Sequence, residues 1–545
     1  MSGSRLHERE EDLQSAADKL GRQLFETQLR ISLSAPVARR EQTLELLREL
    51  AGSLGHFNSP RAGSFQLGIP ERSRGPGPTF LLSCEELATL FHPPNATVRV
   101  PRLASVESRE FAPPKGLAEL SARSGIVSFA RTQFRSQRDL VSLALDDRRR
   151  HLTILGKTGT GKTTLLQNLI VADIQAGHGV ACIEPHGDLA DSLLELIPRS
   201  RTNDVVLFDV GDSSHPLSFN LLACKDPRQR PLVASGIISS FRKLYGAMWG
   251  PRLEHILRNA LLALLEIPGA SLVQVLPLLG DDDYREGVIK HVSDPAVRRF
   301  WEREFAIMPP RLRGEAISPV LNKIGHFISS PVLRNIVGQS ESTLDLRKTM
   351  DEGKILIVNL SKGKVGSDAS ELLGSLLVTA IQLAAMSRAD IAEEDRPDFF
   401  AYIDEFSSFT TEAFASAFSE ARKYRLSLTV ATQFLEQLDE LTLASIFGNV
   451  GTTISFQVSQ HDAEIMANEL GGGLLPSDLL SLPKFQAYVR LLIGGVPSAP
   501  FSVRTLPPAK RRGDEQVART VCRTSQHRYT KPARQVDRHL AAALA

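Results

Sequence analysis

Short apolar runs alternate with helical stretches along most of the chain after residue 135. Apolar runs of this length, separated by helical segments, are typical of a parallel sheet with both faces covered. The pattern therefore predicts an α/β fold with a mainly parallel sheet. The predicted strands cover residues 151–156, 179–185, 204–210, 354–360, 398–404, 426–432 and 451–456.

The same pattern divides the chain into regions. Leucines and alanines at helical spacing predict two amphipathic helices within residues 8–54, and a segment rich in Pro, Gly and Ser at 58–80 reads as a linker or long loop. Between residues 221 and 348 the strand pattern gives way to helical segments alone. We predict a mixed α/β N-terminal domain (1–135), an α/β core in two parts (136–220 and 349–505), an all-α insertion (221–348) and a basic tail (506–545).

Composition places the chain among ordinary globular proteins, because 42% of its 545 residues are apolar and 23% are charged. No uninterrupted apolar run reaches 18 residues and the first residues are charged, so we expect neither a transmembrane segment nor a signal peptide. The four cysteines are far apart and form no C-x-x-C pair. We expect plain thiols in a reducing cytoplasm, without a zinc site or disulfides.

Charge is unevenly distributed although the net charge is only +2. From Thr505 to the end of the chain, nine Lys and Arg residues stand against three Asp and Glu residues. Two interpretations of this tail stay open: contact with a polyanion, and a solvated, partly disordered terminus.

The motif that carries chemistry is GKTGTGKTT at residues 156–164, which fits G-x-x-x-x-G-K-[ST]. It follows a predicted strand and opens a predicted helix, the context in which backbone N–H groups and a helix N-terminus surround a phosphate. Lys162 should reach the β and γ phosphates of ATP, and the Thr163 hydroxyl should bind Mg²⁺. The residues expected to hold the nucleotide are Gly156, Thr158, Gly159, Thr160, Gly161, Lys162, Thr163 and Thr164.

Two acids, Asp404 and Glu405, directly follow the predicted strand at 398–404. In the functional interpretation Asp404 orients Mg²⁺ and Glu405 is the base that polarises an attacking water, which favours hydrolysis over transfer to a substrate. The plainer alternative is a strand that ends in two solvated acids.

Gln433 ends the next predicted strand. An amide there can hydrogen-bond both the attacking water and the γ-phosphate, so we interpret Gln433 as a nucleotide sensor. A polar strand terminus without a role is the alternative.

These motifs together resemble the HerA/FtsK superfamily, and specifically TraG/TraD-type coupling proteins and their HerA-like relatives. The resemblance rests on GKTGTGKTT, IEPHGDL at 183, LSFNLL at 217, IVNLSKG at 357, YIDEF at 402 and EARKYRLSLTVATQ at 420, in order between residues 80 and 505. It implies RecA-like subunits that form hexameric rings and pump DNA with ATP.

By position, the resemblance makes Lys162 and Thr163 the P-loop pair, Asp404 and Glu405 the Walker B pair, and Gln433 the sensor. The arginine eleven residues before the glutamine in that motif acts in trans on the neighbouring subunit's nucleotide, and this position is Arg422. Arg425, three residues on, is the competing candidate.

The chain departs from the family pattern in two places. Coupling proteins usually begin with membrane-spanning helices, so we expect any membrane attachment to come from a separate subunit. Relatives commonly have arginine where this chain has Gln457. If that arginine completes the site, another residue must replace it here, or turnover is slow.

The leading hypothesis is a hexameric ATPase that translocates DNA in conjugative or related transfer, holding the DNA backbone without reading its sequence. The alternatives are a HerA-like repair motor that works with a nuclease, and a nucleotide-gated scaffold that recruits transfer proteins. Expected partners are DNA, other copies of the chain, and a relaxase, a nuclease or a membrane-anchoring subunit. We expect a cytoplasmic protein, with peripheral attachment to the inner membrane as an alternative.

Two weaker features remain. Arg252 could line a channel, although an exposed arginine at a helix start explains it as well, and the three adjacent acids at 281–283 fit a solvated loop better than a metal site.

Overall fold

The computed structural model describes residues 3–33, 35–36, 39–58, 64–65, 79–91, 108–117, 125–509 and 515–544. The chain forms two compact units, Met1–Ser105 and Val106–Ala545. Most of the predicted linker at 58–80 and the basic run at 510–512 lie outside the described residues. The first unit ends before residue 135, where the sequence pattern places the end of the N-terminal domain.

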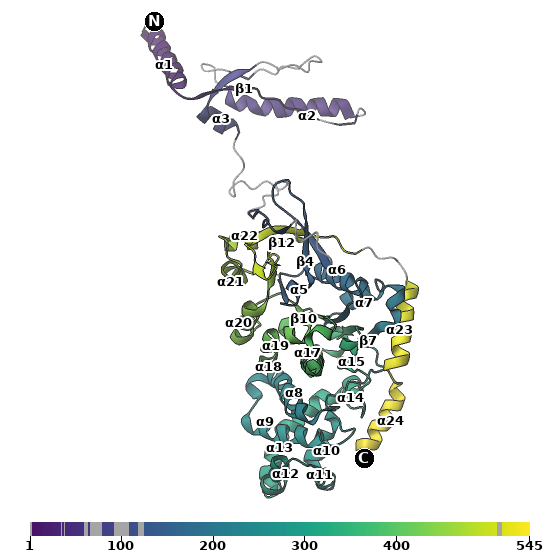
Figure 1. Cartoon of the computed structure of the whole chain (residues 1–545). Helices are drawn as coiled ribbons and strands as arrows, with labels where there is room; N and C mark the ends of the chain where they lie inside the picture. The colour runs from purple at the N-terminus through teal and green to yellow at the C-terminus, as the bar shows by residue number, and fades with distance from the viewer. Residues whose placement is uncertain are drawn as a thin grey trace. The chain divides into compact units, whose positions relative to one another are not determined.

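The first unit is a small mixed α/β module (Figure 1). Strands β1 (Leu24–Thr27) and β2 (Phe80–Ser83) pair antiparallel. Helix α3 (Cys84–Leu90) starts with a capping box, in which the Ser83 hydroxyl accepts the Glu86 N–H and the Glu86 carboxylate accepts the Ser83 N–H. The two helices predicted within 8–54 are α1 (Gly3–Leu20) and α2 (Arg40–Ser53).

The second unit is built on an 11-stranded sheet with the order β4-β3-β15-β12-β11-β5-β10-β9-β6-β8-β7. From β11 to β7 every neighbouring pair is parallel, as the apolar runs predict. The strand β5 carries the P-loop at its carboxyl end. The parallel strands are β5 (Leu152–Leu155), β6 (Gly179–Glu184), β7 (Val205–Asp209), β8 (Ile355–Asn359), β9 (Phe399–Ile403), β10 (Leu426–Thr432) and β11 (Thr452–Ser455).

An antiparallel extension that the sequence analysis missed continues the sheet beyond β11. Strand β3 lies entirely before residue 136, the predicted start of the α/β core, and pairs with β15 across more than 300 residues of sequence. Such long-range pairing leaves no local signal. The extension consists of β3 (Ile126–Thr132), β4 (Leu140–Ala144), β12 (Gln486–Arg490) and β15 (Phe501–Thr505).

Helices cover both faces of the parallel sheet. Alternate side chains of β9 separate onto the two faces: Phe400 and Tyr402 join the core under α6 (Lys162–Gln175) and α7 (Asp188–Leu194), whereas Phe399 and Ile403 join the core that includes α17 (Ser367–Met386). The segment Ser367–Asp390, which contains α17, is long and apolar enough to cross a membrane by length and composition alone. Because 61% of its apolar window is buried, it is explained as a core helix.

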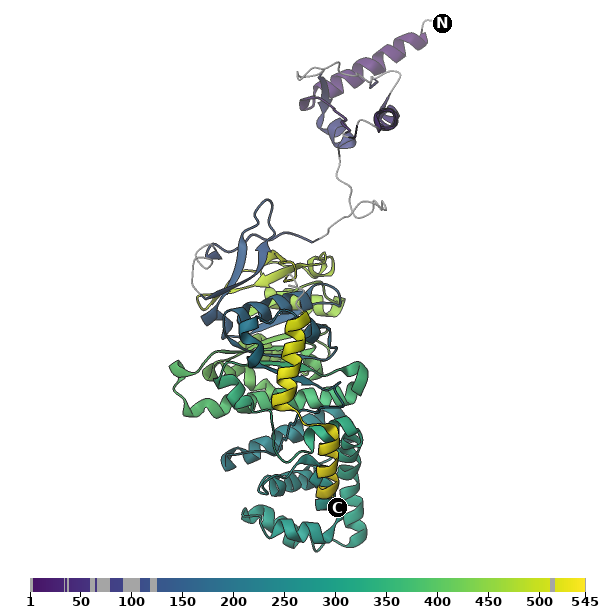
Figure 2. The same cartoon turned by 90° about the vertical axis from the view of Figure 1, so that its right-hand side faces the viewer.

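A group of helices is inserted between β7 and β8 and continues the core on the α17 face, as Figures 1 and 2 show. The described residues of this insertion contain no strand. Helix α8 packs against α17 so closely that a Cβ on Gly236 would lie 2.5 Å from Thr379 Cγ2. The main helices are α8 (Arg230–Tyr245), α9 (Pro251–Leu264), α10 (Val275–Gly280), α11 (Asp282–Ile289), α12 (Pro295–Arg299), α13 (Pro310–Ser329) and α14 (Pro331–Val337).

The described part of the basic tail is folded onto the second unit as α23 (Glu515–Tyr529) and α24 (Ala533–Leu544) (Figure 2). Helix α23 covers the edge strand β7: Val521 is buried, and the Leu207 N–H donates to Ser525 Oγ at 2.8 Å. Helix α24 contacts α14, where Asn335 Nδ2 donates to Asp537 Oδ1 at 3.0 Å. The interpretation as a solvated, partly disordered terminus therefore does not hold for residues 515–544.

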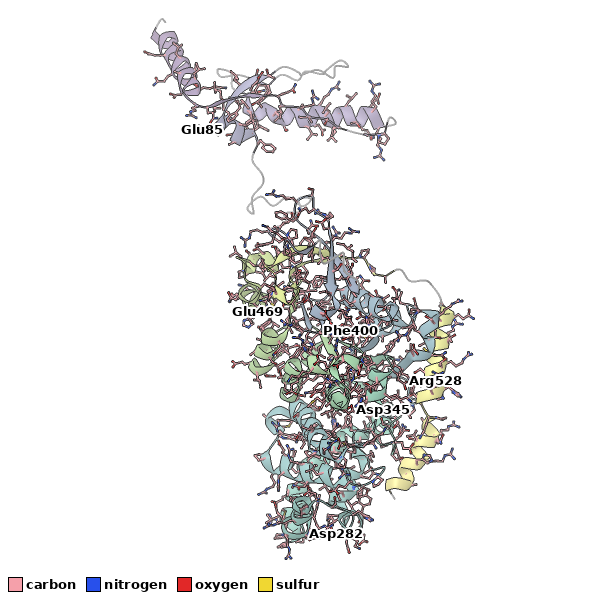
Figure 3. The ribbon with its side chains drawn as sticks, in the orientation of Figure 1. Glu85, Asp282, Asp345, Phe400, Glu469 and Arg528 are labelled. Carbon is pink, nitrogen blue, oxygen red and sulfur yellow. The ribbon has the colours of Figure 1, made fainter. Side chains whose placement is uncertain are left out.

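Covering β7 removes one free edge of the sheet, a site where strands of other chains could add. A basic side chain of the tail takes part in this contact: Arg528 on α23, labelled in Figure 3, donates to the carbonyl of Asn203 just before β7 at 2.8 Å.

We predict that Val521→Asp releases α23 from β7, because it places a carboxylate in a fully buried site. Hydrogen–deuterium exchange should rise by at least about tenfold in both α23 and β7, since detachment removes about 2 kcal/mol or more of packing. The control is Arg523→Asp, which introduces the same side chain at an exposed position two residues on. Equal exchange in the two variants would show that α23 does not protect the edge strand.

Candidate nucleotide-binding site

The predicted site residues meet at the carboxyl edge of the parallel sheet. Because β10 lies between β5 and β9, the segments that follow these three strands are neighbours, and this edge is where open α/β sheets bind ligands. The P-loop follows β5, the acids Asp404 and Glu405 follow β9, and Gln433 follows β10. The structure therefore brings together every predicted site residue except Arg422.

The P-loop backbone requires its glycines. Gly159 and Gly161 have φ angles of +78° and +124°, which side chains disfavour. A Cβ on Gly156 would lie 2.6 Å from Cβ of Phe456, and one on Gly161 would lie 2.8 Å from Cδ1 of Phe485. With α6 starting at Lys162, its free N–H groups face the loop, an arrangement that binds anions.

Lys162 is a buried cation at the start of α6, with 6% of its surface exposed. Its Nζ donates to the carbonyl of Gly156 and to that of Lys157 at 3.3 Å. Burial lowers the pKa of Lys162, and the carboxylates of Glu405 and Asp404 act in the opposite direction. An ammonium held by neutral carbonyls gains most from an anionic ligand, so a phosphate fits this position.

The threonines of the loop have different surroundings. Thr160 is buried and donates from Oγ1 to the carbonyl of Lys157 at 2.7 Å, which closes the loop on itself. Thr163 is exposed and Thr164 is partly buried in the first turn of α6. The role of Thr163 as a metal ligand stays a prediction.

Asp404 is held at the end of β9, where its N–H donates to the carbonyl of Ile183 at 3.0 Å. Its carboxylate accepts the N–H of Glu405 at 3.0 Å and is 6% exposed. Burial raises the pKa of Asp404 to about 6, with a further contribution from the charge of Glu405 and an opposing one from Lys162. A buried carboxylate of this kind is well suited to a divalent cation.

No group of three His, Cys, Asp or Glu side chains among the described residues could hold a metal ion by itself. Mg²⁺ at a nucleotide site is usually bound by one or two protein groups, water and the phosphates. Asp404 and Thr163 are the residues that would hold it.

Glu405 has an unusual backbone, with φ = +50° in the left-handed region. This conformation is uncommon for a residue with a side chain and marks a site where the surrounding structure imposes it. It starts the short 3₁₀ helix η10 (Phe406–Ser408) and turns the chain sharply after β9. The carboxylate of Glu405 accepts a short hydrogen bond from Gln433 Nε2.

Gln433 joins the two halves of the site. While its Nε2 donates to Glu405 Oε1, its Oε1 accepts the Thr158 hydroxyl at 2.7 Å. One amide thus bridges the P-loop and the acid after β9. The sequence analysis placed Gln433 at the site but did not predict these partners.

Glu184 is a site residue that the sequence analysis missed. It ends β6 beside β9, is 2% exposed, and accepts the N–H groups of His186 at 2.7 Å and Gly187 at 2.5 Å. Burial raises the pKa of Glu184, and its charge helps to raise the pKa of Asp404. The signal was present in IEPHGDL, where an acid directly follows an apolar run as Asp404 does.

Gln457, where the family resemblance leads us to expect arginine, lies beside the P-loop. Its carbonyl accepts the Lys157 N–H at 2.8 Å, and its side-chain amide donates to the carbonyl of Leu480 at 2.7 Å. The side chain therefore supports the loop's surroundings rather than supplying a positive charge.

Arg422 lies at the other edge of the sheet, in the 3₁₀ helix η11 (Ala421–Tyr424) before β10. The seven residues of β10 separate it from Gln433 by about 23 Å at the usual rise per residue. It is exposed. Arg425 is tied down within the chain instead: its Nε donates to the carbonyl of Glu393 at 3.1 Å, and its guanidinium lies 3.8 Å from Asp398.

The weaker features have ordinary surroundings. Arg252 is exposed in the first turn of α9. The acids at 281–283 start α11 rather than forming a loop site: Asp281 accepts the Tyr284 N–H at 3.0 Å and Asp282 pairs with Arg285 (Figure 3).

The raised pKa of Asp404 predicts a pH-dependent stability. In the folded protein the Asp404 carboxyl keeps its proton up to about pH 6, whereas the usual pKa of an aspartate is 3.8. Between these values folding takes up a proton, so the free energy of unfolding falls by up to about 3 kcal/mol as pH rises from 3.8 to 6. Asp404→Asn removes this loss. Without nucleotide, its thermal midpoint should exceed that of the wild type increasingly from pH 4 to 6.

The control for this measurement is Asp283→Asn, which changes an exposed carboxylate of the insertion. Its midpoint should keep a constant offset from the wild type over the same pH range. A constant offset for Asp404→Asn as well would show that burial does not destabilise the Asp404 carboxylate.

Comparison with known proteins adds to this geometry. The family described as type IV secretion-system coupling protein DNA-binding domain matches residues 137–474. The trigonal form of the bacterial conjugative coupling protein TrwBdeltaN70 with sulphate is 16% identical with a TM-score of 0.52, covering 77% of this chain and 98% of that one. Plasmid coupling protein TrwB with the GTP analogue GDPNP is 16% identical with a TM-score of 0.50, covering 74% and 95%.

At this identity the two structures support the fold alone, and they confirm the predicted RecA-like α/β architecture. No curated protein sequence matches the chain. The family match spans more than half of the residues, including the P-loop, the acids after β9 and the whole insertion. The chain therefore belongs to the type IV secretion-system coupling protein family, as a P-loop ATPase of the TraG/TraD type.

Proposed function

We propose that the protein is a ring-forming ATPase that moves DNA during conjugative or related DNA transfer. The observation that carries the proposal is the bridge from Thr158 through Gln433 to Glu405. It joins the loop that would bind phosphate to the acid that would activate water, so nucleotide occupancy and hydrolysis can be linked at one side chain.

Each residue at the edge has a distinct task in hydrolysis. Lys162 and the N–H groups at the start of α6 bind the β and γ phosphates of ATP. Thr163 and Asp404 are the residues that would hold Mg²⁺, and the ion would neutralise the charge that develops on the phosphates. Glu405 accepts a proton from the attacking water, and its left-handed backbone sets the direction of its carboxylate.

Gln433 acts as the sensor by exchanging partners. Its amide hydrogen-bonds both Thr158 and Glu405. A γ-phosphate at the P-loop competes for the same donors and frees the Glu405 carboxylate for water. The amide carries no charge, so it can make this exchange without a large desolvation penalty.

Arg422 completes the site of a neighbouring subunit in this proposal. Its position at the far end of β10 excludes contact with its own P-loop, and its exposure suits an interface. A guanidinium that reaches the neighbour's transferring phosphoryl group stabilises its charge. Arg425 is the weaker candidate because Glu393 and Asp398 already hold it.

The family's description names a DNA-binding domain. A pump should hold DNA through its phosphates, so we propose binding that is independent of sequence and falls steeply with salt. The exposed arginines of the tail, Arg519, Arg523 and Arg534, are candidate contacts. A relaxase, a nuclease or a membrane-anchoring subunit is the proposed protein partner. The proposed location is the cytoplasm, with peripheral attachment to the inner membrane as the alternative.

The test is steady-state ATPase activity with and without DNA of arbitrary sequence, at several salt concentrations. DNA should raise the rate by about tenfold or more at low salt, and the stimulation should disappear at high salt. Lys162→Ala should lose tight ATP binding because it removes phosphate charge neutralisation. Glu405→Gln should keep binding and lose turnover by about 10² or more, because only the base is removed.

Two results would contradict the proposal. Equal loss of ATP binding in Lys162→Ala and Glu405→Gln would refute the assigned roles. An ATPase rate that DNA leaves unchanged would favour the nucleotide-gated scaffold.

For Arg422 we predict that Arg422→Ala binds ATP and forms rings but hydrolyses about 10³-fold more slowly, since an arginine that contacts the transferring phosphoryl group contributes about 10³ to 10⁵ in rate. Mixing Arg422→Ala with Lys162→Ala subunits should restore activity, because an intact P-loop then faces an intact arginine. The matched control is Arg425→Ala.

If mixed rings form and remain inactive while dilution with wild-type subunits behaves normally, Arg422 does not act in trans. Restoration with Arg425→Ala instead would transfer the role to Arg425.

A further inference from the structure

A lysine of the insertion contacts the loop that follows the Walker B acids. Lys243 lies in the last turn of α8, and its Nζ donates to the carbonyl of Ser407 at 2.6 Å. Ser407 is two residues after Glu405, in the 3₁₀ helix η10. One hydrogen bond thus connects the first long helix of the insertion to the segment that positions the proposed base.

The loop around Ser407 is tightly wound, so its carbonyl cannot move alone. The Ser408 N–H donates to the Glu405 carbonyl at 2.9 Å, and the Phe409 N–H donates to the Phe406 carbonyl at 2.9 Å. A displacement of the Ser407 carbonyl therefore shifts the backbone that holds Glu405 in its left-handed conformation.

The side chain of Ser407 links the same turn to the sensor strand. Its Oγ donates to Gln437 Oε1 at 2.7 Å and lies 3.2 Å from Thr432 Oγ1. Thr432 is the last residue of β10 and directly precedes Gln433. Lys243 thus contacts a turn that directly follows Glu405 in the chain and is hydrogen-bonded to Thr432, the neighbour of Gln433.

The packing around this contact is close enough to transmit small movements. Helix α17 lies against α8 at Gly236 and Thr379, and a Cβ on Gly374 of α17 would collide with the ring of Phe409. Phe409 is fully buried at the end of the same turn. Interfaces that are closely packed shift as units rather than deforming gradually.

Lys243 is exposed as a residue, but its ammonium is directed at the protein, where it contacts the Ser407 carbonyl. Desolvation lowers the pKa of Lys243, and the carboxylates of Glu371 in α17 and of Asp439, the N-cap of α20 (Glu440–Asn449), act in the opposite direction. A lysine that only filled a surface position would keep its ammonium in water, where it is better solvated.

We propose that Lys243 is a positioning residue that couples the insertion to the nucleotide site: the Ser407 contact passes the state of the Glu405–Gln433 pair to α8, and a ligand on the insertion alters turnover by the same contact. The proposal rests on the proposed ATPase function. It assigns this coupling to one named contact.

The first experiment is hydrogen–deuterium exchange on the full-length protein with and without Mg²⁺ and a non-hydrolysable ATP analogue. In the wild type, the analogue should protect the P-loop and change exchange in the last turn of α8. Lys243→Met should keep the change at the P-loop and lose the change at α8. Lys243→Arg, which keeps a charged donor, should restore at least part of it.

The control is Lys290→Met, which removes an exposed lysine of the same insertion whose Nζ pairs with Glu286 at 3.0 Å. It should behave as the wild type. The second readout is ATPase activity. Lys243→Met should retain the basal rate within about twofold. Its stimulation by DNA should be about tenfold lower than that of the wild type, the size expected for one coupling contact.

The outcomes separate the two proposals. No protection of the P-loop in the wild type would refute nucleotide binding itself. Protection of the P-loop with an unchanged α8, or an α8 response that Lys243→Met retains, would overturn the coupling role. If Lys243→Met lowers the thermal midpoint, the basal rate and the DNA stimulation together, and Lys243→Arg does not restore them, then Lys243 only caps η10 and has no coupling role.

Discussion

The site depends on charges of opposite sign that are buried at one edge of a sheet. Lys162 is enclosed by loop carbonyls, and the carboxylates of Asp404 and Glu184 lie at the ends of neighbouring strands with almost no exposure. Burying charge without full pairing is unfavourable, and burial accordingly raises the pKa of Asp404 to about 6. A phosphate and a divalent cation would supply the missing charges, so the arrangement fits a nucleotide with Mg²⁺.

The rest of the second unit keeps this edge in place. Alternate residues of β9 anchor it in two cores, so the loop carrying Glu405 starts from a fixed strand end. A buried group of Arg148, Asp173 and Tyr402 ties the last turn of α6 to β9, with both Arg148–Asp173 hydrogen bonds at 2.6 Å. The insertion and the tail close the remaining faces: α8 reaches the turn after Glu405, and α23 covers β7.

Local patterns made most of the site predictable. The seven parallel strands are short apolar runs, and the P-loop glycines, Asp404, Glu405 and Gln433 stand at fixed offsets from their ends. What could not be predicted depends on contacts between distant segments. The strand order that places β10 between β5 and β9, and so joins Gln433 to Thr158 and Glu405, has no local signal. The pairing of β3 with β15 has no local signal either. The docking of α23 on β7 depends on apolar positions such as Val521, which stand among the basic residues of the tail.

The proposed coupling of hydrolysis at this edge to DNA movement can be measured as displacement of streptavidin from the biotinylated end of a DNA molecule by the wild-type protein with Mg²⁺ and ATP. We expect displacement at a rate that follows ATP hydrolysis and stops when ATP is replaced by a non-hydrolysable analogue. If DNA stimulates hydrolysis but no streptavidin is displaced, the protein does not move DNA.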